Sequence, residues 1–74
     1  MTFKQFETVR FVGPPTFAPE LEYGEVGTVL EVYDDSNFEV EFTFPDGSTK
    51  TLQSFPIEYL TKHSPELPLR KEIT

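Results

Sequence analysis

A strict two-residue alternation between positions 38 and 44 is the feature that most constrains the fold. Apolar residues occupy every even position of this run, and Glu or Thr occupies every odd one. Successive side chains of a β-strand point to opposite faces, so the pattern predicts a strand with one face buried and one in water. The set predicted to face the core is Phe38, Val40, Phe42 and Phe44.

Four further segments also have strand patterns, so the whole chain is predicted to be all-β. Residues 6–12 form the first expected strand, with Val9 and Phe11 on one face. Residues 27–33 are rich in β-branched side chains, which favour strands. The pattern leaves the inward face of this second strand open, because residues 28, 30 and 32 compete with residues 29, 31 and 33. Residues 49–52 and a brief segment ending near position 60 complete about five antiparallel strands.

The hairpin after position 44 can be assigned by parity. A two-residue turn at Asp46–Gly47 would place Leu52 opposite Glu41, on the polar face. A three-residue loop, Pro45–Gly47, instead sets Leu52 opposite Val40, and it suits a fixed Pro dihedral followed by a left-handed Gly. We therefore predict the three-residue loop, which also pairs Glu41 with Thr51 and Thr43 with Thr49.

The segment after the hairpin predicts a short 3-10 turn that leads into the last strand. Pro56 suits the first position of such a turn, with Phe55, Ile57 and Leu60 directed inward. We expect one β-domain over residues 1–63 and a flexible C-terminal tail over residues 64–74. Leu67, Leu69 and Ile73 of this tail are candidates for docking on a partner or on a second copy.

Composition excludes several function classes. The 74 residues contain no Cys, so neither a disulfide framework nor a thiolate metal site is available. No run approaches the about 20 apolar residues of a membrane span, and a cytoplasmic location is expected. The net charge of −7 repels phosphate backbones, which argues against nucleic acid as a partner.

The residues do not assemble a recognisable catalytic set. The lone histidine, His63, follows the last expected strand and has no evident orienting partner. No nucleophile elbow and no phosphate-binding glycine loop is present, so we expect no enzymatic activity and no cofactor. Oxygen ligands cluster in one turn, but their spacing matches no EF-hand and a hairpin turn explains them, so we expect no metal. They are Asp34, Asp35, Asn37 and Glu39.

Two surface features have both a structural and a functional interpretation. Glu31, Glu39 and Glu41, with Glu7 nearby, predict a negative stripe that either keeps the protein soluble or docks a basic partner. Aromatic residues also exceed what a small core needs. They either fix loops to the sheet or form an interaction patch. The residues in excess are Phe3, Phe17, Tyr23 and Tyr33.

The order and spacing of these motifs resemble known families. Residues 24–29 are similar to the KOW element of ribosomal proteins and transcription elongation factors, and residues 55–60 look like the closing segment of signalling SH3 domains. Residues 24–33 and 38–42, followed by Gly47, Leu52 and Leu60, resemble the bacterial domain-of-unknown-function family 4926. The resemblance implies an SH3-like small barrel and carries no activity.

We therefore expect a non-catalytic module that binds a protein partner with a basic surface. Aromatic side chains would supply affinity, and carboxylates would supply steering. The alternatives are a KOW-like nucleic-acid module, which would need Lys4, Arg10, Lys50 and Lys62 on one face, and a structural protein that self-associates. We expect a monomer or a weak homodimer. The predicted partner-binding residues are Phe17, Glu20, Glu22, Tyr23, Glu31, Glu39 and Glu41.

Overall fold

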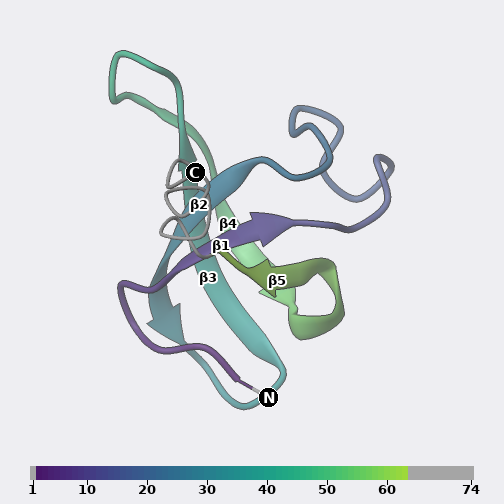
Figure 1. The fold of residues 1–74 in the computed structure, drawn as a ribbon, viewed down its shortest axis with the longest axis vertical. Coiled ribbons are helices and arrows are strands. Elements are labelled where there is room, and N and C mark those ends of the chain that lie inside the picture. Colours follow the sequence, from purple (N-terminus) through teal and green to yellow (C-terminus); the bar gives the residue numbers. More distant parts are fainter. Residues whose placement is uncertain (1, 64–74) are drawn as a thin grey trace, which may run out of the picture.

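The computed structural model describes residues 2–63, which form five antiparallel strands in one sheet (Figure 1). The strand order is β4-β3-β2-β1-β5, and the predicted tail at residues 64–74 lies outside the described residues. The all-β prediction with a 3-10 turn before the last strand is confirmed. The elements are β1 (Thr8–Phe11), β2 (Val26–Val32), β3 (Asn37–Thr43), β4 (Thr49–Pro56), η1 (Ile57–Tyr59) and β5 (Leu60–Lys62).

One face of the sheet forms the core. The Phe55 ring lies at its centre, in edge or tilted contact with Phe11, Phe17 and Phe42 at centroid distances of 5.8, 5.4 and 5.4 Å. Phe11 belongs to β1 and Phe55 to β4, which β2 and β3 separate in the sheet. The sheet therefore curls, so that strands distant in the ladder meet across the core. Phe3 closes one end by packing on Phe38 at 5.3 Å.

The register of β4 differs from the prediction. The three-residue loop is present: Phe44 N–H donates to the Ser48 carbonyl at 2.9 Å, and Gly47 has a φ of +93°. Thr43 also pairs with Thr49, as expected. Beyond this pair Lys50 has no partner in β3, so a β-bulge shifts the register by one residue and reverses the faces of β4.

The predictions that paired Leu52 with Val40 and Glu41 with Thr51 are therefore wrong. Leu52 lies opposite Glu41 and is 48% exposed, while Thr51 turns to the core and is 7% exposed. Phe44, which was expected inside, is 46% exposed. It follows the last residue of β3, where the hairpin has already left the core (Figure 1).

A second bulge determines which residues of β2 face the core. Val29 pairs with Val40 and Glu31 pairs with Glu39, which leaves Leu30 without a partner. Gly27 and Val29 before the bulge are buried, but the residues after it leave the core and are exposed. Neither of the two alternating sets therefore faces inward over the whole strand. The inward set predicted around η1 fits better, since Phe55 and Leu60 are buried and Ile57 packs against the core.

Gly27 marks a position where β2 approaches β3 too closely for a side chain. A Cβ atom there would lie 2.7 Å from the Phe42 ring and 2.9 Å from the Glu41 carbonyl oxygen. The ring is locked in the core, and the carbonyl belongs to the neighbouring strand. Neither atom can yield without disturbing packing.

We expect Gly27→Ala to lower the free energy of unfolding by about 1–3 kcal/mol, the usual effect of overpacking a core. Urea denaturation followed by circular dichroism measures the change. Thr43→Ala, at an exposed strand position, serves as the control and should shift stability by less than about 0.5 kcal/mol. Equal stability of Gly27→Ala and the unmodified protein would contradict the close approach.

Candidate functional site

Three glutamates lie on the outer face of the sheet, on β2 and β3. Glu39 and Glu41 alternate with the buried residues of β3, and the bulge at Leu30 brings Glu31 directly opposite Glu39. We call Glu31, Glu39 and Glu41 the acidic face. Thr49 donates its hydroxyl hydrogen to Glu41 Oε2 at 2.6 Å, and Tyr33 donates its phenolic hydrogen to Glu39 Oε1.

The hydrogen bond to Glu39 holds the Tyr33 side chain beside the acidic face. The bond to Glu39, with the nearby charges of Glu39 and Glu31, raises the pKa of the Tyr33 phenol above its usual value. The ring itself is 55% exposed. An exposed aromatic side chain is therefore fixed beside the paired carboxylates, as an interface residue would be.

Three basic side chains bond to groups outside the acidic face. Lys50 Nζ lies 2.9 Å from Glu25 Oε2, and Lys62 Nζ lies 2.9 Å from Glu7 Oε2. Arg10 donates to the Gly24 carbonyl at 3.0 Å. Three of the four basic residues that a nucleic-acid face would require are thus engaged in bonds within the chain. The same pairs correct one prediction, since Glu7 joins Lys62 of β5 and not the acidic face.

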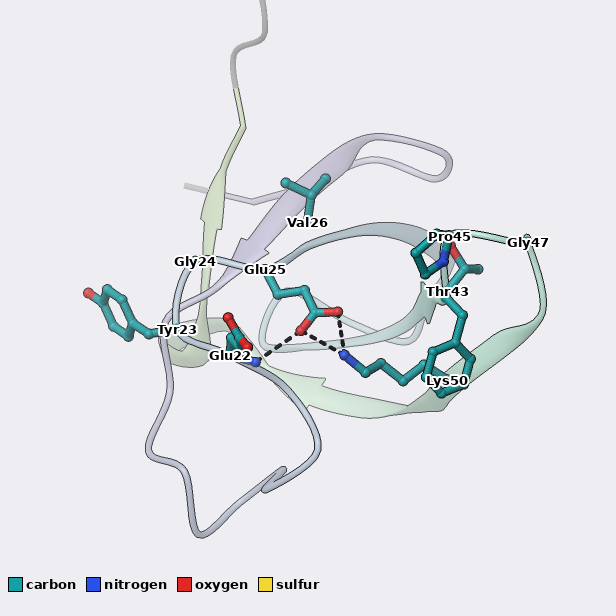
Figure 2. A pocket seen from close by; sticks show the side chains of 10 residues that line it. Glu22, Tyr23, Gly24, Glu25, Val26, Thr43, Pro45, Gly47 and Lys50 are labelled. Atoms are coloured by element: carbon teal, nitrogen blue, oxygen red, sulfur yellow. Dashed lines mark hydrogen bonds and ion pairs between the residues drawn. The ribbon is translucent and has the colours of Figure 1, made fainter.

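An open groove of about 710 Å³ lies beside the β3–β4 hairpin (Figure 2). Residues 22–26 form one wall, and the β3–β4 hairpin forms the other. Thr43, which lines the groove, lies two residues beyond Glu41 and therefore on the same face of β3. The acidic face and the groove are thus contiguous.

An ion pair spans the groove. Lys50 reaches from the hairpin to Glu25, whose carboxylate also accepts a hydrogen bond from the Glu22 backbone N–H at 2.9 Å (Figure 2). The side chains of Lys50 and Glu25 are each 20% exposed. Lys50 Nζ lies 5.7 Å from the centre of the Phe44 ring, a favourable cation–π distance. The pair joins the long β1–β2 connection to the hairpin.

The predicted site residues fall into three places. Glu22 and Tyr23 line the groove, and Figure 2 shows the Tyr23 ring pointing away from the ion pair; this side chain is 79% exposed. Glu20 accepts a hydrogen bond from the Thr51 hydroxyl, which lowers the pKa of its carboxyl group. Phe17 packs on Phe55 and on Tyr59. The predicted residues of the acidic face lie together on the sheet.

Phe3 and Phe17 support the structural interpretation of the aromatic excess. Phe3 is buried, and the Phe17 ring lies 4.9 Å from Tyr59, so both fix loops to the sheet. Tyr23 and Tyr33 remain exposed. Four further residues line the groove that the sequence pattern did not indicate: Glu25, Phe44, Pro45 and Lys50. No signal in the sequence indicated the β-bulge at Lys50, because the three-residue loop already placed Leu52 on the core face without it.

The oxygen cluster after β2 acts as a turn. Asp34 Oδ1 accepts hydrogen bonds from the backbone N–H groups of Ser36 and Asn37, at 2.8 and 2.9 Å, which lowers the pKa of Asp34. Glu39, another charged candidate ligand, bonds to Tyr33. Within residues 2–63, no three acidic or histidine side chains are grouped to hold a metal ion. The same residues include no helix long and apolar enough to span a membrane.

We expect the Lys50–Glu25 pair to contribute about 1 kcal/mol to stability, near the upper end for partly exposed ion pairs. A double-mutant cycle of Lys50→Met, Glu25→Gln and the double variant measures this coupling by urea denaturation. The coupling should decrease in 1 M NaCl because salt screens the pair. A coupling energy near zero would show that the two walls are joined by packing alone.

Stability should fall in acid because several carboxyl groups have a lowered folded-state pKa. Hydrogen bonding to Lys62 is the largest cause for Glu7, and hydrogen bonding to Ser48 is the largest cause for Asp46. A lowered folded pKa adds stability above the unfolded value, 4.5 for Glu, and this stability is lost as the pH falls through the folded pKa.

Melting temperatures measured from pH 7 to pH 2.5 test this expectation. We expect Glu7→Gln to be less stable than the unmodified protein at pH 7 and to approach it below the folded pKa of Glu7. Glu58→Gln, which changes an exposed residue of η1, is the matched control and should leave the curve unchanged. Parallel curves for Glu7→Gln and the unmodified protein would contradict the assignment.

Comparison with known proteins identifies a family and no activity. The model of the family described as "Domain of unknown function (DUF4926)" matches residues 15–62, well over half of the 74-residue chain. The match runs from the β1–β2 connection to the end of β5 and so includes both the groove and the acidic face. Searches of curated proteins and of solved structures found no match. The resemblance noted in the sequence is confirmed, and the chain belongs to the DUF4926 family.

Proposed function

We propose that this protein is a small non-catalytic module that binds a protein partner with a basic surface. The observation that carries the proposal is the direct opposition of Glu31 and Glu39 in the β2–β3 ladder. Like charges opposite each other destabilise a sheet. A chain that only needs to remain soluble has many exposed positions for carboxylates, so a repulsive pair is better explained by a cation that binds there.

Charge distribution supports the same proposal. Lys50 and Lys62 pair with carboxylates outside the acidic face, so no cation among the described residues is paired with Glu31, Glu39 or Glu41. The net charge of −7 adds a long-range field of the same sign. Such a field accelerates the encounter with a basic partner and repels acidic ones.

Exposed aromatic side chains would supply the affinity that screened charges do not. Tyr33 is attached to the acidic face through Glu39, and Phe44 and Tyr23 flank the contiguous groove. Aromatic residues are enriched at interface hot spots, where they bury much surface with few rotatable bonds. Phe17 is 37% exposed, and Phe55 and Tyr59 hold its ring in place.

The proposal includes a fold of the SH3-like small-barrel type. The strand order, the long connection after β1 and the 3-10 turn before β5 support this assignment. So does the contact of Phe11 with Phe55, which joins strands that are not ladder neighbours. Small barrels of this kind present their loops and one sheet face to partners, in agreement with the position of the groove.

Stability and binding should respond in opposite directions when the repulsive pair is removed. We expect Glu31→Gln and Glu39→Gln each to raise stability by a few tenths of a kcal/mol, because a like-charge pair is lost. Each should also weaken the capture of basic proteins from a native extract at low salt. Glu58→Gln removes the same charge from η1 and should affect neither quantity.

Affinity capture at 50 and 500 mM NaCl, followed by mass spectrometry, measures the binding arm, and urea denaturation measures the stability arm. A basic protein retained at low salt by the unmodified module and by Glu58→Gln, and lost with Glu31→Gln, is the expected result. Identical capture by all three would reject the acidic face as the docking surface. Retention of RNA alone would favour the KOW-like alternative, and retention of untagged copies alone would favour a structural role.

A further inference from the structure

Strand β4 lies at an edge of the sheet and has a central stretch without a charged residue, a proline or a bulge. β3 is its one ladder partner among the described residues. The residues between Lys50 and Pro56 carry no charge, although 26% of the whole chain is charged. We call residues 51–55 the β4 window; they are Thr51, Leu52, Gln53, Ser54 and Phe55.

Exposed strand edges are normally blocked because their free N–H and C=O groups bind other chains. The ends of β4 follow this rule: the bulge at Lys50 interrupts one end, and Pro56 lacks an N–H group at the other. The β4 window between them has neither device. Leu52, its second residue, exposes an apolar side chain on the outer face, beside Glu41.

We infer that the β4 window accepts an extended segment of the partner protein as a sixth strand, with arginine or lysine on the face shared with Glu39 and Glu41. This inference rests on the proposed function and specifies how the partner is held. Main-chain hydrogen bonds to the window provide affinity, and alternating side chains provide selectivity, as in other cases of strand addition.

Charge complementarity determines the side chains of the added strand. Such a strand would lie next to β4 and about 10 Å from β3, two interstrand spacings away. On the outer face, the window places only Leu52 and Ser54 in between, which are uncharged. The long side chains of arginine and lysine can cross this row to reach Glu39 and Glu41, and their methylene groups can cover Leu52.

The inner face of the window also has a carboxylate nearby. Glu20 accepts a hydrogen bond from Thr51, and Phe17 packs against Phe55, so the β1–β2 connection flanks the same stretch of β4. Two residues predicted as partner-binding from the sequence thus lie beside the edge and not on the acidic face. An added strand would meet negative charge on both of its faces.

A second copy of this protein is the less suitable occupant. Pairing β4 with β4 would bring together two chains that each carry a net charge of −7 and an acidic face one strand from the contact. Repulsion between like charges opposes that arrangement. The negative field of the protein attracts a basic partner, whereas it repels a second copy.

Three synthetic hexapeptides with alternating arginine and valine, acetylated and amidated at their ends, test the inference with the full-length protein. One is unmodified, one is N-methylated at every arginine, and one is N-methylated at every valine. Alternate residues of a strand direct their N–H groups to opposite edges, so only one N-methylated peptide loses its bonds to β4. Titration calorimetry gives the affinities, and amide hydrogen exchange by NMR locates the contact.

We expect one N-methylated peptide to bind at least tenfold more weakly than the unmodified peptide, and the other to bind within about threefold of it. Amide exchange within residues 51–55 should slow when the unmodified peptide binds. Glu39→Gln and Glu41→Gln should weaken binding and reduce its salt dependence, whereas the matched control Glu58→Gln should change neither.

Equal binding of all three peptides, still weakened by Glu39→Gln, would overturn strand addition and leave docking on the acidic face intact. Absence of binding up to about 1 mM would also overturn strand addition; the capture experiment, which uses no peptide, then decides the proposed function. Sedimentation of the protein alone as a dimer with slowed exchange in the β4 window would assign the edge to a second copy, against the inference.

Discussion

A single sheet has to cover its own apolar face in this protein, because η1 is the only helical element within residues 2–63. The sheet does this by curling, and the contacts of Phe55 show it. Its ring contacts Phe11 of β1, which is not a ladder neighbour of β4, Phe42 of the adjacent β3, and Phe17 of the β1–β2 connection. The core, the position of the long connection and the outward display of the glutamates all depend on this curling of the sheet.

The parts of the fold that follow from side-chain period were predictable. Buried and less buried residues alternate without interruption along β3. The faces of Phe38, Val40 and Phe42 could therefore be assigned from the sequence alone. The prediction failed where a strand contains an extra residue. A β-bulge changes which residues face the core but leaves no fixed signature in composition. The reversal at Lys50 and the split facing around Leu30 were therefore accessible only in three dimensions.

The same distinction applies to the candidate site: some of its features follow from side-chain alternation, and others depend on the bulges. Glu39 and Glu41 belong to the regular alternation of β3, and their outward position followed directly from it. The opposition of Glu31 and Glu39 depends on the bulge in β2. The pairing of Glu25 with Lys50 joins residues 25 positions apart and depends on the bulge in β4. Charge pairs between strands can be predicted only when the strand register is known, and parity alone assigned the register of β4 wrongly.

The two bulges also give β3 a distinctive place in the geometry of the sheet. Over the same span of ladder, β2 and β4 each contain one residue more than β3, at Leu30 and at Lys50. Each neighbour thus has a path about 3.3 Å longer than the strand between them. Strands of unequal path length cannot lie flat together and keep their hydrogen bonds, so each bulge bends and twists the sheet beside β3. The curvature of the sheet is in this sense specified by counting residues, independently of which side chains they carry.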